Sequence, residues 1–225
     1  MDLENMETGR FLGILIVILV IFAGLLMFAA GLFYPFGFAA LGINPDSTYS
    51  YSAAIEATGE LTGVTMFLPV VSNKGNSPIG VEFADGRAIG LGSGITTDYF
   101  AAKDAAFVKL TVDKLKRENF GAEVEVEKII DTKNPAKNAY LFAPAEADSD
   151  PANYKINVYL KYDCDPDTVV KISLKCTGKN AWSYNGDKEN SYTNTAELSV
   201  KGPQNGWITA DASCVSGVGD YRISI

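Results

Sequence analysis

An uncharged run near the N-terminus constrains this chain more than any other feature. Residues 11–45 contain no Asp, Glu, Lys or Arg, and their first part, FLGILIVILVIFAGLLMFAAGLF at residues 11–33, is almost wholly aliphatic or aromatic. A helix needs about 20 apolar residues to cross a bilayer core, whereas the apolar core of a cleaved signal peptide has only about 7 to 15. No helical phase leaves the polar face that a surface helix needs. We therefore predict a transmembrane α-helix over residues 11–33, with the lipid bilayer as its partner.

The flanking charges predict the orientation of that helix. Arg10 directly precedes the uncharged run, and no Lys or Arg follows it until Lys74. Because basic flanks favour the cytoplasmic side, residues 1–10 are predicted to be cytoplasmic and the C-terminal part extracellular. Pro and Gly oppose continuation of the helix over residues 34–48, which we interpret as a juxtamembrane linker. The prediction is a single-pass protein of the cell membrane.

The rest of the chain has the pattern of strands and turns. It is rich in Thr, Ser, Asn and Gly, and β-branched residues alternate with polar ones between frequent Pro and Gly. This predicts an all-β, antiparallel, sandwich-like extracytoplasmic domain, preceded by a single N-terminal transmembrane α-helix. The acidic, proline-containing stretch 144–153 is predicted to be a linker. It separates a β-rich first half, residues 49–143, from a C-terminal β-sandwich unit, residues 154–225.

Strand patterns in the first half differ in clarity. Strands are predicted at residues 49–59, 61–71, 78–86 and 122–131, and GLGSG at residues 90–94 is predicted to be a turn. In AEVEVEKIID, Val124 and Val126 should face inward and the glutamates outward. Residues 98–118 are ambiguous, because their alanines favour a helix while AFVKLTV alternates like a strand. We predict a strand over residues 108–112.

The C-terminal unit has the clearest alternation. In YKINVYLKYDC (154–164) and TVVKISLKC (168–176) every second residue is apolar, with the turn DPDT (165–168) between them. Two neighbouring strands with matched apolar faces predict a hairpin. Further strands are predicted at residues 195–200, 206–215 and 221–225.

The chain has three cysteines, which alternation places on the core face. If residues 165–168 are a hairpin turn, Cys164 lies beside the turn and Cys176 near the far end of the partner strand. Their Cα atoms would then exceed the ~4.4 to 6.8 Å that a disulfide needs. Cys176 with Cys214 is therefore the better disulfide candidate, and three reduced, buried thiols are the alternative.

A run of alternating carboxylates follows the same strand. Asp163, Asp165 and Asp167 are spaced like the oxygen ligands that open a calcium loop. Thr168 stands where that loop needs glycine, and Leu174 where it needs glutamate. A simple Asp-Pro-Asp turn is the better interpretation, and Ca²⁺ at these three residues is the one metal or cofactor that stays open.

Composition excludes several function classes. The chain has no histidine, which rules out Ser-His-Asp triads, Cys-His dyads and imidazole zinc sites. Nothing in the sequence places two carboxylates across a cleft, so we predict no enzyme activity and no catalytic residue. The net charge of -8 opposes binding to phosphate backbones, and nucleic acid is not an expected partner.

Three stretches carry a resemblance to known proteins. Residues 61–80, 130–138 and 201–221 resemble segments of uncharacterised archaeal membrane-anchored cell-surface proteins of halophiles and methanogens. The resemblance covers most of the outer domain and implies an archaeal envelope location. It implies no activity and no functional residues, and the cysteines are not part of its pattern.

The preferred functional hypothesis is a non-catalytic envelope protein with a structural or adhesive role, contacting other envelope proteins. One alternative is a filament subunit resembling an archaeal type IV pilin, in which copies pack through their N-terminal helices. Small residues seven apart would allow close helix approach: Ala23, Gly24, Ala30 and Gly31. A second alternative is an extracytoplasmic ligand-binding module for cations or glycans. Its candidate stacking aromatics are Trp182, Tyr184, Tyr192 and Trp207.

Overall fold

The computed structural model describes most of the C-terminal part of the chain. The described residues are 20–22, 45–73, 75–102, 105–135, 141–143, 150, 152–183 and 186–221. Residues 20–22 are helical, and the remainder of the predicted membrane segment lies outside this set, together with Ala23, Gly24, Ala30 and Gly31. Within the described part of the chain, no helix combines the length and apolarity needed to cross a membrane. Pro45–Tyr221 form one compact unit.

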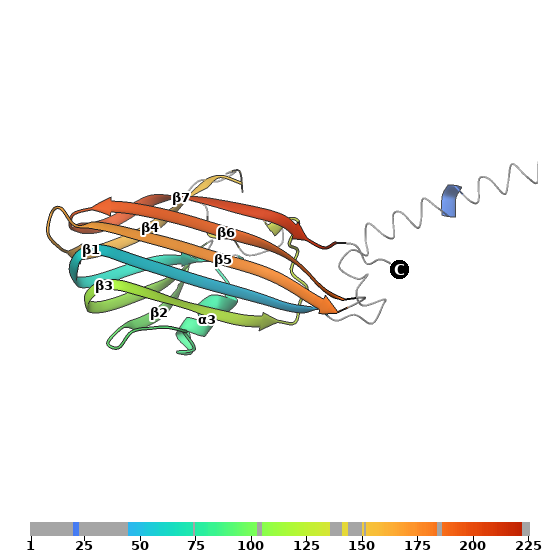
Figure 1. The fold of residues 1–225 in the computed structure, drawn as a ribbon, viewed down its shortest axis with the longest axis horizontal. Helices are drawn as coiled ribbons and strands as arrows, with labels where there is room; N and C mark the ends of the chain where they lie inside the picture. The colour runs from blue at the N-terminus through green and yellow to red at the C-terminus, as the bar shows by residue number, and fades with distance from the viewer. Residues whose placement is uncertain are drawn as a thin grey trace, which may run out of the picture. The chain divides into compact units, whose positions relative to one another are not determined.

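The compact unit is all-β in class, as predicted, and each of its strand pairings is antiparallel. Its elements in chain order are β1 (Asp46–Val70), α3 (Pro78–Ala84), β2 (Thr96–Ala101), β3 (Ala106–Val126), β4 (Tyr154–Asp163), β5 (Val169–Ser183), β6 (Asp187–Lys201) and β7 (Gln204–Gly219). Figure 1 shows β1 running between β5 and β3. The predicted strand over residues 108–112 is confirmed as part of β3.

Strand β1 organises the sheet. One of its edges pairs with β3, while residues 46–57 on the other edge pair with β5 and residues 62–67 pair with β4. Because β4 also pairs with β7, β7 with β6 and β6 with β5, these five strands form a closed circuit of pairings. The register of β1 against β3 shifts between Glu56 and Leu61, where β1 passes from one partner to the other.

The predicted hairpin between residues 154–164 and 168–176 is wrong. The strands exist as β4 and β5, but they pair with successive parts of the same edge of β1 and not with each other. The reason is length: β1 has 25 residues, whereas β4 has 10 and β5 has 15. Both therefore fit end to end along β1, and the turn at residues 165–168 carries the chain from one to the other.

The core lies between the strands and follows their alternation. Ile55, Met66, Leu110, Ile156 and Cys176 are completely buried. The inward orientation predicted for Val124 and Val126 is confirmed, because they pair with buried Tyr49 and Ser47 while the neighbouring glutamates are exposed. Residues from before and after the predicted linker belong to the same hydrophobic cluster.

Helix α3 occupies residues that were predicted as a strand, and that prediction is wrong. The Ser77 hydroxyl caps the helix by accepting a hydrogen bond from the Gly80 amide at 3.0 Å, and proline stands in the first turn. These start signals outweigh the β-branched residues of PIGVEFADG. The ring of Phe83 then packs against Tyr51 and Phe120, each with a 5.8 Å centroid separation. The helix thereby covers part of the core beside β1 and β3.

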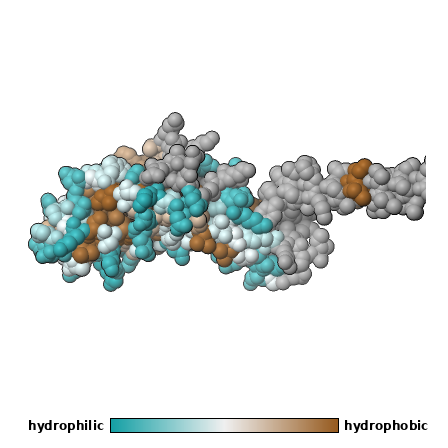
Figure 2. Space-filling view, turned by 90° about the horizontal axis from the view of Figure 1, so that it is seen from above, coloured by the Kyte–Doolittle hydropathy of each residue, from teal (hydrophilic) through white to brown (hydrophobic). Residues whose placement is uncertain are grey.

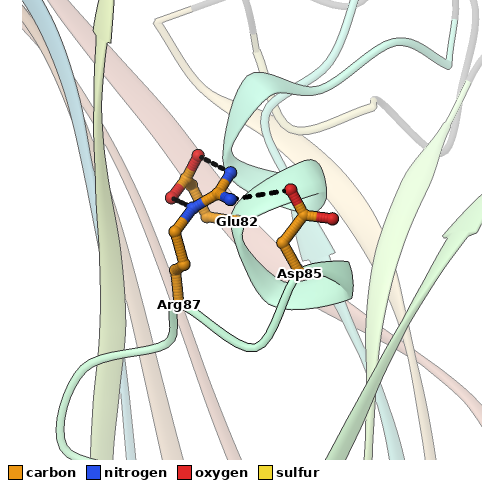
Figure 3. Close-up of polar contacts among 3 residues, drawn as sticks. All are labelled: Glu82, Asp85 and Arg87. Carbon is orange, nitrogen blue, oxygen red and sulfur yellow. Dashed lines mark hydrogen bonds and ion pairs between the residues drawn. The ribbon is translucent and has the colours of Figure 1, made fainter.

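Three charged side chains hold the end of α3 (Figure 3). The Arg87 guanidinium donates to both carboxylate oxygens of Glu82, at 2.6 and 2.7 Å, and contacts a carboxylate oxygen of Asp85 at 2.8 Å. Glu82 is nearly buried, so this bidentate pairing satisfies a carboxylate that would otherwise lose its hydration.

Candidate functional site

Five aromatic side chains form a continuous cluster on the outer face of the strands. Phe67 contacts Phe100, Tyr159 and Trp207, with ring centroids 5.4, 5.5 and 6.3 Å apart. Trp207 also contacts Phe107 and Tyr159, each at 5.5 Å. Each ring comes from a different strand, in the order β2, β3, β1, β4 and β7. We call these five residues the aromatic platform.

Strand register explains why these rings meet. One row of direct cross-strand partners runs over the five strands. In strand order it consists of Asp98, Lys109, Phe67, Tyr159 and Trp207. Phe100 and Phe107 pair with each other in the adjacent row. Paired residues of an antiparallel sheet point to the same face with Cβ atoms ~5 Å apart. The platform therefore stands on hydrogen-bonded backbone and not on loops.

The platform is open to solvent. Trp207 is 58% exposed and Phe100 is 47% exposed, and the other three rings are partly exposed. Figure 2 shows hydrophobic atoms grouped between hydrophilic ones on one face of the compact unit. A rigid group of exposed aromatic rings is typical of an interaction site, because scattered single apolar residues are the norm elsewhere on a protein surface.

A second row of side chains runs alongside the platform. Its members are successive cross-strand partners on the same five strands: Thr96, Thr111, Thr65, Lys161 and Asn205. We call them the polar row. Each residue of the polar row is two positions along its strand from the row that contains Phe67 and Trp207. Because side chains alternate with a period of two, both rows lie on the same outer face. The Tyr159 hydroxyl links the two rows by donating to Asn205 Oδ1 at 3.3 Å.

An open groove of about 580 Å³ lies over a different part of the sheet. Its outward-facing lining comes mostly from small and polar residues, including Ser50, Ser52, Gly121, Ser173 and Thr195. Glu123, Lys175 and Glu197 lie at this groove. The groove lacks the converging ionisable groups of a reaction centre, so the aromatic platform is the stronger candidate for a functional surface.

The predicted disulfide is not formed. All three cysteines lie in the described part of the chain, and each is a free thiol. Cys176 of β5 and Cys214 of β7 are both partners of Asn194 in the intervening strand β6. They are therefore two strand spacings apart, ~9.5 Å, beyond the Cα separation that a disulfide bridges. The sequence could not show that one strand would lie between them.

The three aspartates predicted as weak calcium ligands are not brought together. Asp163 ends β4, and the highly exposed Asp167 pairs with Lys201 at 2.8 Å. Among the described residues, no three His, Cys, Asp or Glu side chains converge in a way that could hold a metal ion. The structure thus gives no support for Ca²⁺ at Asp163, Asp165 and Asp167.

The predicted stacking aromatics separate into two kinds. Trp182 and Tyr192 are core residues, 6% and 0% exposed, and Tyr184 lies outside the described residues. Trp207 alone is confirmed as exposed. Alternation could identify it, because Ile208 and Ala210 face the core and Trp207 must face away. Its partners Phe67, Phe100, Phe107 and Tyr159 were missed, because they are scattered over four segments and only the register joins them.

A buried polar network near the start of β1 is structural. The Asn180 side chain accepts from Ser47 Oγ and Ile130 N, at 2.7 and 2.9 Å, and donates to Asn190 Oδ1 at 2.8 Å. Thr132 Oγ1 donates to the same Asn190 oxygen at 2.8 Å. Paired buried groups of this kind hold the segment after β3 in place and leave no group of Asn180 directed at a ligand.

Comparison with known proteins adds no identity. No protein-family model, curated protein or solved structure matches the chain. The resemblance to archaeal surface proteins therefore stays a prediction.

Proposed function

We propose that this protein is a non-catalytic, membrane-anchored protein of the cell envelope that contacts a partner through its aromatic platform. In this proposal residues 11–33 anchor the chain, residues 1–10 stay in the cytoplasm, and the β unit lies outside the cell. The observation that carries the interaction role is the exposed five-ring cluster on paired strands. Exposure of Trp207 and Phe100 to water is unfavourable for the isolated protein. A bound partner would remove this cost by burying the two rings.

The chemistry of the described residues favours binding over catalysis. Glu123 and Glu197, the two carboxylates at the groove, belong to β3 and β6, which are separated by β1 and β5. The residue of β6 in the same cross-strand row as Glu123 is Thr193, four positions from Glu197, so the two backbones are roughly 20 Å apart. Their side chains project from one face in parallel. Acid and base pairs that cleave glycosides need carboxyl groups about 5 to 9.5 Å apart, on opposite sides of the bond.

The location is tested with the full chain in intact cells. External protease is expected to digest the β unit, and the chain is expected to leave the membrane only with detergent. Protection of the β unit in intact cells, with digestion after lysis, would overturn the extracellular placement.

The interaction role is tested with full-length protein in lipid vesicles, mixed with isolated cell-envelope fragments. Trp207→Ala should reduce the amount of vesicle bound at least tenfold. The control is Val215→Ala, because Val215 is on the same strand and is equally exposed at 60% but lies outside the platform. Equal loss in both variants, or no loss in either, would contradict a role for the platform.

A further inference from the structure

The aromatic platform and the polar row form one continuous surface with two chemistries. Each row crosses five strands, which spans ~19 Å, and the two rows are ~7 Å apart along the strands. We propose that this surface binds a neutral, linear glycan. Its pyranose rings stack on the aromatic platform, and their hydroxyl groups bond to the polar row. The inference rests on the proposed function and names the chemical class of its partner.

The residue types match the two sides of a sugar. A pyranose ring presents an apolar face of C–H bonds and a rim of hydroxyl groups. The π face of an aromatic ring carries negative charge density and attracts polarised C–H bonds. Thr65, Thr111 and Asn205 donate and accept hydrogen bonds, as a hydroxyl rim requires. The platform and the polar row contain no Leu, Ile, Val or Met, which are the residues that would serve a purely hydrophobic contact.

The charges favour an uncharged ligand. Lys109 Nζ lies 3.9 Å from a carboxylate oxygen of Asp98, so the only ionised pair in the aromatic row is internally compensated. Lys161 is the single charged residue of the polar row. An acidic polymer would need several uncompensated cations along the surface, because its affinity comes mainly from neutralised charges.

The exposed area is too small for a stable contact with a second copy. The five rings have total areas of roughly 150–250 Å² each. Only Trp207 and Phe100 expose more than a third of that area, at 58% and 47%. The exposed aromatic surface is thus on the order of 400 Å², against about 800 Å² per partner in a standard protein interface. This area is sufficient for a single glycan chain, because the glycan is narrow and its hydroxyl groups also form hydrogen bonds with the polar row.

The test uses the full chain in lipid nanodiscs and three soluble neutral hexasaccharides: β-1,4-linked glucose, β-1,4-linked N-acetylglucosamine and α-1,6-linked mannose. Binding is measured by calorimetry and by tryptophan fluorescence, which reports on exposed Trp207 against buried Trp182. At least one hexasaccharide is expected to bind with heat release and a fluorescence change that persist at high salt. Trp207→Ala and Tyr159→Ala should each weaken that binding at least tenfold.

Two further variants separate recognition from folding. Thr65→Val keeps the side-chain shape and removes one hydroxyl, and it should weaken binding several-fold with an unchanged unfolding midpoint. Val215→Ala should bind like the wild type. Failure of all three hexasaccharides to bind overturns the proposal, and so does binding that Trp207→Ala leaves intact.

The two experiments distinguish a wrong glycan assignment from a wrong interaction role for the platform. If Trp207→Ala abolishes vesicle binding to envelope fragments but no hexasaccharide binds, the platform has a partner that is not a neutral glycan. Concentration-dependent association in sedimentation velocity would then identify a second copy. If Trp207→Ala changes neither envelope nor glycan binding, both proposals fall.

Discussion

Among the described residues, Glu82 is the one charged residue that is buried, and its carboxylate is held by a fixed partner. The bidentate hydrogen bonds from Arg87 hold the pKa of the Glu82 carboxyl below its ordinary value. Because the folded-state pKa is below the unfolded-state value of about 4.3, this pairing stabilises the fold above that pH. The stabilisation is lost as the pH falls through the folded-state pKa.

Replacing Glu82 should therefore have a pH-dependent effect. Glu82→Gln is expected to lower the free energy of unfolding by about 1 to 2 kcal/mol near neutral pH, because a charged hydrogen-bond acceptor is lost. The difference from wild type should shrink in acid, where wild-type Glu82 is itself protonated. Urea unfolding at both pH values measures this. Asp85→Asn, at a half-exposed partner of the same arginine, should change stability by less than about 0.5 kcal/mol. An equal loss at both pH values would contradict the assignment.

The cysteines give a second residue-scale prediction. Burial raises the pKa of Cys214 to about 11 and raises that of Cys176 as well. Desolvation also raises the pKa of the partly exposed Cys164. Since the thiolate is the nucleophile, iodoacetamide should label Cys164 slowly and leave Cys176 and Cys214 unlabelled in the folded protein. Mass spectrometry of tryptic peptides measures this. In denaturant without reductant, iodoacetamide should label all three cysteines. Two cysteines that stay unlabelled under these conditions would show that they form a disulfide.

At the scale of elements, helix α3 depends on one glycine. A Cβ built on Gly80 lies 2.1 Å from Tyr99 Cε2, and the Tyr99 hydroxyl is held by a 2.6 Å hydrogen bond to the Gly75 carbonyl. Gly80→Ala gains about 1 kcal/mol in helix propensity but forces the ring to move, at about 1 to 3 kcal/mol.

We expect Gly80→Ala to lower the midpoint of thermal unfolding. Val81→Ala is the control, because Val81 is on the same helix and is 46% exposed; it should stay within about 0.5 kcal/mol of the wild type. A Gly80→Ala protein that is more stable than the wild type would show that Tyr99 does not pack on the helix as described.

At the scale of the whole molecule, β1 joins the two halves of the compact unit. It pairs with β3 from the first half and with β4 and β5 from the second, and one hydrophobic cluster spans both. We therefore expect a single cooperative unfolding transition, with circular dichroism and tryptophan fluorescence coinciding.

The same topology predicts that neither half folds alone. Residues 45–143 and residues 152–221, made separately, should lack slowly exchanging amides, because β4 and β5 lose their common partner strand and β1 loses one edge. Hydrogen exchange of each half, compared with the full chain, measures this. Cooperative unfolding of either half by itself would instead support two domains divided at residues 144–153.

Local patterns were enough to identify most strands, because alternation directly reports which side chains avoid water. The buried positions in YKINVYLKYDC and the inward valines of AEVEVEKIID are examples. The strand predicted for PIGVEFADG is wrong, because its β-branched residues favour a strand while Ser77 and Pro78 begin a helix. Contacts of Ile79 and Phe83 with the core add to these start signals and stabilise the helix.

By itself the sequence determined the all-β class, the outward direction of Trp207 and the absence of imidazole chemistry, because these depend on residue type and short-range alternation. Tertiary structure alone decided that β4 and β5 share an edge of β1, that Asn194 separates Cys176 from Cys214, and that five distant aromatic rings meet on one face. The physical reason is that strand pairing is specified by long-range register. Alternation says which face a side chain takes but not which strand will lie beside it.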